Sequence, residues 1–498
     1  MNRRFVLGLF LSLLSLSLVA QPMRDAVTIE VVDVPVFVVR DGESVRGLRG
    51  EDFELFVNGK RQSIDFFDEI GAAESQPGSL RERRLFLLMF DLAFSQPPAL
   101  NRAQKAAAKL LTTASPGDLF SIATYSWRRG VWFVTPFTSD QVALARAIGS
   151  LSDSGSGDPL SLVLTTAERQ SMTAAWRGYL TDDRPSDALD RISGEALRDV
   201  FRAEHLRAVE HQMRDLEKLG ERLGTLQGQK HVILLSEGYD AEPRDYVATP
   251  AASAGRDSFD MVTTRVSNFG WNYGTLSRHL RAMRESFAGH DVLLHALDLR
   301  GVVSPMISDA LLTLTDETGG RYVNNRNDLG RALVDLTESL GHGYVLGFKP
   351  SNARAKHNSI EVKVKGQPRN TLVRHRQGFS GTPSQLDVHE GLYLADVVMN
   401  DVPQTGTAPS LAKSEHGLEV RVPLRPLSAQ LGAAGKAELF VYLFGANNVP
   451  IGFQKISVEV PADATGEKTL VVRLPEGAEV AKALLRVDDS LGFSRTDV

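Results

Sequence analysis

The stretch that decides the fold is Arg84–Ser95, which reads RLFLLMFDLAFS. Its apolar run, Leu85–Phe90, has no polar residue in alternation and ends at Asp91. A short continuous apolar run of this kind is typical of a strand that is buried on both faces, as in a parallel sheet covered by helices. The stretch therefore predicts a central strand of an α/β sheet, with Asp91 at the carboxyl end of that strand.

Strand-type and helix-type segments alternate on both sides of this stretch. The clearest are the helical patterns Ala99–Thr113, Gln141–Leu151 and Leu329–Leu340 and the apolar runs Leu119–Tyr125, His231–Leu235 and Asp291–Leu297. Such alternation predicts βαβ units, so we expect a Rossmann-like, mostly parallel sheet over residues 80–342. A break at Arg128–Gly130 is too short for a crossover and predicts a hairpin, which makes one edge strand antiparallel.

A helical insert at residues 165–227 interrupts this alternation. Its apolar residues recur at spacings of three and four: Leu206, Val209, Met213, Leu216, Leu219, Leu223 and Leu226. This spacing is that of an amphipathic helix. The helix could form a coiled-coil arm for a partner, or it could lie on its own domain, and we favour the second interpretation.

The segments that flank residues 80–342 have β patterns. Residues 25–70 contain the hairpin signal Asn58-Gly59, but three or four strands are too few to be stable alone. We therefore expect this segment to pair with the β segment 343–378. Short strands with turn residues between them then predict a C-terminal β-sandwich over residues 390–498. The predicted fold class is α/β with flanking β-sandwich segments.

The first residues of the chain predict export. Arg3 and Arg4 precede the apolar run Phe5–Val19, which is the pattern of a secretory signal peptide at residues 1–20. We expect a periplasmic or extracellular protein with no membrane span after cleavage, because no second apolar run is long enough. The chain has no cysteine, so its predicted folds cannot depend on disulfides.

The composition is that of an ordinary globular protein. Of the 498 residues, 42% are hydrophobic and 23% are charged, and the net charge is -5. The length suggests two to four domains. The small negative charge and the absence of a basic run argue against a nucleic-acid partner.

Oxygen-bearing side chains follow two of the predicted strands. Asp91 and Ser95 follow the first strand, and Ser236 and Glu237 follow the strand at 231–235. Ligands of open α/β sheets bind beyond the carboxyl ends of the strands, so we expect these residues to share a crevice with Asp158 from a Gly/Ser-rich loop. An all-oxygen set suits Mg²⁺ or Ca²⁺. These loops contain no histidine and no nucleophile-base pair, so we assign no catalytic residue.

The three loops, Asp91–Ser95, Asp158–Leu160 and Ser236–Gly238, resemble the metal-ion-dependent adhesion site of von Willebrand factor type A domains. In that family the first loop reads Asp-x-Ser-x-Ser, a Thr comes from the second loop and an Asp from the third. The resemblance implies a Rossmann-like A domain in which hydroxyl groups touch the metal directly and the third-loop acid acts through water.

The resemblance extends over residues 25–380 to the exported von Willebrand factor A-related proteins of Acidobacteria and similar bacteria. It rests on the signal peptide and on the segments Val45–Leu48, Asp52-Phe53, Leu234–Gly238, Thr318–Gly320 and Tyr344–Phe348. We interpret the glycines of Thr318–Gly320 as the C-cap of a helix that feeds the next strand.

Three positions depart from the family pattern. Ala93 replaces a Ser, Asp158 replaces the Thr, and Glu237 replaces the Asp. The residues leave two interpretations of the site open. Asp91, Ser95, Asp158 and Glu237 hold Mg²⁺ or Ca²⁺, or the acidic residues bond to loop amides without a metal.

For function, we expect an exported, non-enzymatic protein-interaction or adhesion protein with a degenerate metal-ion-dependent adhesion site. Ser236, Trp271 and Tyr273 are the candidate partner-binding residues, the last two because aromatic residues in a long loop often serve recognition. The alternative is an envelope scaffold or assembly subunit whose A domain is inert and metal-free. A protein partner follows from either interpretation, and the sequence does not fix the oligomeric state.

Overall fold

The structure, a computed structural model, describes most of the chain in several stretches. These are residues 32–40, 43–71, 83–126, 129–151, 207–238, 273–303, 309–350, 358–368, 370–379 and 390–498. The predicted signal peptide 1–20, the insert residues 165–206, Asp158 and Trp271 lie outside the described residues.

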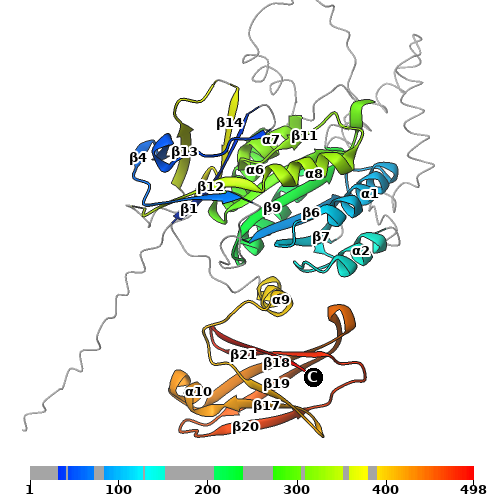
Figure 1. Ribbon diagram of the computed structural model, residues 1–498, viewed down its shortest axis with the longest axis vertical. Helices are drawn as coiled ribbons and strands as arrows, with labels where there is room; N and C mark the ends of the chain where they lie inside the picture. The colour runs from blue at the N-terminus through cyan, green and yellow to red at the C-terminus, as the bar shows by residue number, and fades with distance from the viewer. Residues whose placement is uncertain are drawn as a thin grey trace, which may run out of the picture.

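The central sheet of the protein contains six strands in the order β11-β10-β9-β6-β7-β8 (Figure 1). The strands are β6 (Arg84–Asp91), β7 (Asp118–Ser126), β8 (Gly130–Phe133), β9 (Gln229–Ser236), β10 (Val292–Asp298) and β11 (Tyr322–Val323). All neighbours are parallel except β7 and β8, which form the hairpin at the edge. Every residue of β6 is buried, as the apolar run from Leu85 predicts for a central strand.

Helices cover both faces of the central sheet. On one face, α1 (Pro97–Thr113), α2 (Gln141–Ser150) and α8 (Leu329–Ser339) share a core with the sheet. On the other face lie α6 (Tyr273–Gly289), α7 (Asp309–Thr318) and the helix at 207–224. In such helix-covered sheets, ligands bind beyond the carboxyl ends of the strands.

The helix at 207–224 uses its apolar stripe inside its own domain. Val209, Met213, Leu216, Leu219 and Leu223 are at most 2% exposed and belong to the core under β6 and β9. The interpretation of this stripe as a face packed on its own domain is confirmed for these residues.

A first β unit joins the two ends of the α/β domain. One sheet has the order β14-β1-β12-β5 and the other the order β15-β13-β3-β4. The strands are β1 (Val32–Arg40), β2 (Glu43–Ser44, beside β1), β3 (Phe53–Val57), β4 (Lys60–Gln62), β5 (Phe66–Gly71), β12 (His342–Phe348), β13 (Asn358–Val364), β14 (Thr371–His375) and β15 (Gly378–Phe379). Val34 pairs with Leu346, and Leu55 pairs with Val362. The N-terminal strands thus share one apolar core with strands about 300 residues later in the chain.

A C-terminal β unit is formed by two further sheets over one core. Its strands are β16 (Ser410–Ser414), β17 (Gly417–Pro423) and β20 (Glu467–Val472) in one sheet, and β18 (Gly435–Gly445), β19 (Val449–Val460), β21 (Val480–Val487) and β22 (Ser490–Asp497) in the other. The helix α10 (Leu424–Leu431) connects β17 to β18. The expectation of a β-sandwich from residue 390 is wrong at its start, where Glu390–Asn400 form the helix α9. Val397, Val398 and Val402 of this segment pack on the outer face of the β18 sheet, and this burial stabilises the helix.

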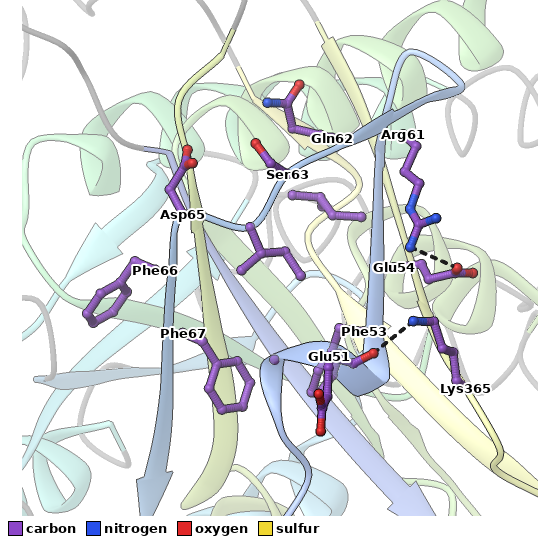
Figure 2. A pocket seen from close by; sticks show the side chains of 13 residues that line it. Glu51, Phe53, Glu54, Arg61, Gln62, Ser63, Asp65, Phe66, Phe67 and Lys365 are labelled. Atoms are coloured by element: carbon purple, nitrogen blue, oxygen red, sulfur yellow. Dashed lines mark hydrogen bonds and ion pairs between the residues drawn. The ribbon is translucent and has the colours of Figure 1, made fainter.

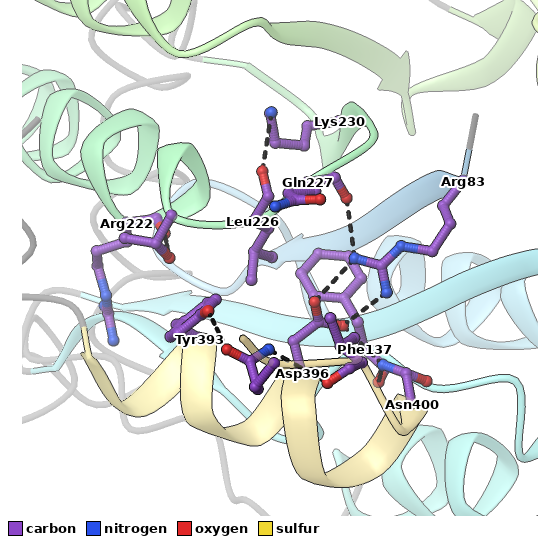
Figure 3. Close-up of polar contacts among 12 residues, drawn as sticks. Arg83, Phe137, Arg222, Leu226, Gln227, Lys230, Tyr393, Asp396 and Asn400 are labelled. Carbon is purple, nitrogen blue, oxygen red and sulfur yellow. Dashed lines mark hydrogen bonds and ion pairs between the residues drawn. The ribbon is translucent and has the colours of Figure 1, made fainter. Parts of the chain in front are cut away.

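The helix α9 also contacts the base of the α/β domain (Figure 3). Arg83 donates to both carboxylate oxygens of Asp396, at 3.1 and 2.8 Å, and also to the carbonyl of Gln227 at 2.9 Å. Asn400 Nδ2 donates to Asp396 at 2.8 Å and to the carbonyl of Phe137 at 2.9 Å. The side chains of Arg83 and Asp396 are only 14% and 3% exposed, so a buried ion pair lies at this joint.

No helix in the described stretches is both long enough and apolar enough to span a bilayer.

Candidate functional site

The candidate site lies where three neighbouring parallel strands end. Asp91 is the last residue of β6, Ser236 the last of β9 and Asp298 the last of β10. The pairing of Phe90 with Leu235 and of Ser236 with Asp298 places these ends in one row. The edge of the sheet therefore collects polar side chains, as expected for the carboxyl ends of parallel strands.

The carboxylate of Asp91 is enclosed by donors from the chain. Its Oδ1 accepts from the backbone N–H groups of Ala93 and Phe94, both at 3.1 Å, and its Oδ2 accepts from the Ser236 hydroxyl at 2.6 Å. Gln212, from the helix at 207–224, lies close enough to this carboxylate to lower its pKa. Asp91 is 0% exposed.

Burial decides the ionisation of Asp91. Loss of water around the carboxylate raises its pKa from 3.8 to about 6, although the nearby polar groups of Ser236, Phe94, Ala93 and Gln212 act in the opposite direction. The desolvation of the charged form thus outweighs these donors. The folded protein holds a proton on Asp91 more tightly than the unfolded chain does.

Ser95 and Glu237 form a second pair of contacts between the same loops. Ser95 Oγ accepts from the backbone N–H of Glu237 at 3.1 Å, and Glu237 Oε2 accepts from the backbone N–H of Gln96 at 2.7 Å. Gln96 is the N-cap residue of α1 and its own side chain makes no cap bond. The Glu237 carboxylate therefore satisfies a backbone donor at the positive end of this helix.

The structure brings together four of the residues that the sequence singled out: Asp91, Ser95, Ser236 and Glu237. Tyr273 is the first residue of α6, and its side chain lies outside the described residues. Asp158 and Trp271 also lie outside them, so their roles stay predictions.

In the described stretches the oxygens of these four residues are bonded to one another and to the backbone. No group of three or more His, Cys, Asp or Glu side chains in the described stretches could hold a metal. Asp91 offers two oxygens that already accept from the chain, and the Glu237 carboxylate is bonded to Gln96. At position 93, alanine gives no hydroxyl, and its N–H bonds to Asp91 instead. Mg²⁺ and Ca²⁺ take six or more oxygens, some of them from water. The described residues of this edge supply two carboxylates and two hydroxyl groups, all bonded to the chain.

Two parts of this edge were not predicted from the sequence. Asp298 at the end of β10 accepts from Arg300 through both carboxylate oxygens, the shortest contact being 2.6 Å, and from the Tyr322 hydroxyl at 2.7 Å. An Asp at the end of an apolar run, with Arg two residues later, is a signal that could have revealed the first contact. Gln212 had no such signal, because only the packing of its helix brings it to Asp91.

Comparisons with known proteins do not assign this chain to a family. No known protein family and no curated protein matches it. Among solved structures it is similar to an aerotolerance-related membrane protein from Bacteroides fragilis, with a TM-score of 0.26 and 10% identity over 52% of this chain and 98% of that one. It is also similar to a von Willebrand factor type A protein from Catenulispora acidiphila, with a TM-score of 0.26 and 10% identity over 90% of this chain and 72% of that one.

A third similar structure is the pilus adhesin SpaC from Lactobacillus rhamnosus GG, with a TM-score of 0.24 and 9% identity over 84% of this chain and 53% of that one. At this low similarity, only the residues of this chain indicate its fold and its function. The fold and the site define an α/β protein with a helix-covered, mostly parallel sheet and an internally bonded carboxylate at its carboxyl edge.

Replacing Asp91 by asparagine is expected to stabilise the protein at pH 7.5. The asparagine keeps an acceptor for the two backbone N–H groups and removes the buried charge, whose shifted pKa corresponds to about 3 kcal/mol. Weaker hydrogen bonds offset part of this, so we expect a gain of about 1–2 kcal/mol in the free energy of unfolding. Urea unfolding of both proteins measures it.

The pH dependence of this gain has a definite sign. Because the folded pKa of Asp91, about 6, lies above its unfolded value, its contribution to stability is present below about pH 4 and is lost as pH rises through 6. The advantage of the variant should therefore shrink at pH 4.5. Asp68→Asn, at an exposed carboxylate, should show no such change. A variant that is less stable than wild type at pH 7.5 contradicts the prediction.

Proposed function

We propose that the protein is an exported, non-enzymatic interaction or assembly protein whose helix-covered domain acts as a metal-free scaffold. The observation that supports this best is the state of Asp91, which is fully buried and accepts hydrogen bonds on both oxygens. A cation at Asp91 would have to share a fully buried carboxylate with three hydrogen-bond donors. This favours the scaffold alternative of the sequence over metal-assisted adhesion.

The hydroxyl groups of the crevice support a non-enzymatic role. Ser236 donates to Asp91, and Ser95 accepts from the Glu237 backbone. A serine nucleophile needs an adjacent base that is itself oriented by a third group. In the described stretches neither hydroxyl has a histidine as its hydrogen-bond partner, so both serines act here as cross-links between loops.

Calorimetric titration tests the metal-free state. Mg²⁺, Ca²⁺ and Mn²⁺ are titrated separately into the protein without residues 1–20 and into its Asp91→Asn variant. We expect only dilution heat in both. Saturable heat in the wild type that disappears in the variant would overturn the proposal and support a cation held by Asp91, Ser95, Asp158 and Glu237.

The interaction role has its own test. The immobilised protein is used to capture partners from envelope extract with and without a chelator, and a denatured sample of the same protein is the control. We expect the same specific partners in both conditions. Partners that are lost only in the presence of chelator would contradict the metal-free scaffold, and capture equal to that of the denatured control would contradict the interaction role.

A further inference from the structure

A groove opens at one side of the first β unit, between β5 and the β3–β4 hairpin (Figure 2). Its volume is about 540 Å³. Phe53, Leu55, Ile64 and Phe67 supply apolar lining, and Phe53 and Leu55 are core residues that are 3% and 0% exposed. The groove is large enough for several side chains of a ligand and leads to the apolar core between the two sheets.

Both sheets of this unit end at the groove. β5 is the last strand of the sheet β14-β1-β12-β5, and β4 is the last strand of β15-β13-β3-β4. Within the described residues, one side of β5 therefore has no neighbouring strand. A strand edge of this kind can pair with an added strand through its backbone groups. Phe66, at the start of β5, is 52% exposed and adds apolar surface beside this edge.

The charges at this edge are mainly negative. Asp65, Asp68 and Glu69 lie within five consecutive residues, and all three are exposed. Glu51 and Glu54 add two carboxylates on the hairpin side of the groove. Arg61 pairs with Glu54 at 3.2 Å and neutralises it, and Lys365 donates to the backbone carbonyl of Glu51 at 2.8 Å. The negative charge beside β5 is therefore mainly that of Asp65, Asp68 and Glu69.

This charge distribution decides between possible occupants. A second copy paired through β5 would bring like charges together, which is unfavourable in a cross-strand pair. A basic strand gains opposite charges instead. Alternating side chains would then point in turn toward the apolar groove and toward the acidic rim.

We propose that β5 and its groove bind an extended, basic peptide segment of a partner protein, which adds to β5 as a further strand with alternating apolar and basic side chains. The inference rests on the proposed interaction role, and it adds a surface that lies outside the crevice. Lysine or arginine of the partner lies on the face of β5 that carries Asp68, and the apolar side chains lie on the opposite face, beside Phe67.

Fluorescence anisotropy tests the proposal with a labelled ten-residue peptide of alternating valine and lysine, in buffer of low ionic strength with chelator. The control peptide alternates valine and glutamate. We expect the lysine peptide alone to bind, and Asp68→Lys to weaken it by about tenfold. Glu476→Lys makes the same charge change at an exposed turn of the C-terminal β unit and should leave the affinity within about twofold.

Hydrogen exchange separates strand addition from general charge attraction. With the lysine peptide bound, amides in residues 64–71 should exchange more slowly, because they gain backbone partners. Absence of binding, equal binding of the two peptides, equal loss in both variants, or unchanged exchange at 64–71 would each overturn the proposal. These readouts do not involve Asp91, so a failure here is distinct from a failure of the metal-free scaffold.

Discussion

Replacing Asp396 by alanine is expected to lower the free energy of unfolding by about 4 kcal/mol, because it leaves Arg83 buried without its counter-ion. Both Arg83 nitrogens that contact Asp396 lie in a side chain that is 14% exposed. The remaining carbonyl of Gln227 satisfies one donor but supplies no negative charge. Asn400 also loses a hydrogen-bond partner on Asp396.

The effect should appear at the joint between α9 and the α/β domain. Urea unfolding followed by fluorescence measures the loss in free energy, and hydrogen exchange of residues 390–400 reports whether α9 detaches. Asp335→Ala is the matched control. Asp335 pairs with Arg331, and the two side chains are 42% and 67% exposed, so this pair contributes at most about 0.5 kcal/mol to the free energy of unfolding.

A second variant distinguishes the lost charge from lost packing. The double change Arg83→Met and Asp396→Leu removes both charges and keeps apolar volume, so it should recover most of the stability. Equal stability of Asp396→Ala and Asp335→Ala would contradict the importance of the buried pair.

Replacing Gly320 by alanine is expected to cost about 4 kcal/mol or to prevent soluble expression. A Cβ atom at this position would lie 1.8 Å from the carbonyl oxygen of Leu294, which belongs to the backbone of strand β10 in the central sheet. Neither atom can move without disturbing the sheet. The neighbouring Gly319 has a φ of 80° just after α7 ends at Thr318, as the helix C-cap interpretation requires.

Soluble yield and urea unfolding measure the effect at Gly320. Gly149→Ala is the control, because this glycine lies in α2 with nothing within 4 Å of an added Cβ. Alanine there should be neutral or stabilising by up to about 1 kcal/mol. Unfolding of Gly320→Ala at the same urea concentration as the wild type would contradict the close contact between this turn and the backbone of β10.

Much of the α/β domain could be predicted from local patterns. The run before Asp91 is β6, the strand at 231–235 lies inside β9, and the short break after Tyr125 is the β7–β8 hairpin. These patterns are readable because burial on two faces requires continuous apolar runs, and a hairpin needs only a short turn. The helix α9 was not predicted because its valines are equally compatible with a strand. The helix is stabilised by packing of these valines on the sheet of β18 and β21, which the local sequence does not show.

The candidate site was predicted in part. Asp91, Ser95, Ser236 and Glu237 meet because the carboxyl ends of adjacent parallel strands lie at one edge. Their chemical state could not be read from the residue types. An aspartate at this place could hold a cation or bond to the chain, and the choice depends on which donors the tertiary structure brings to it.

The sequence by itself determined the strands and helices of the central domain and the residues at its carboxyl edge, since apolar periodicity and strand ends are local properties. Only the tertiary structure decided that Ser236 bonds to Asp91, that Gln212 lies beside it and that Asp396 neutralises Arg83. These partners are separated by more than 100 residues in the chain. The tertiary structure also decided that, among the described residues, no strand pairs with the outer side of β5. The physical reason is that pairing between distant segments is selected by the burial and charge of the whole fold, which no local spacing encodes.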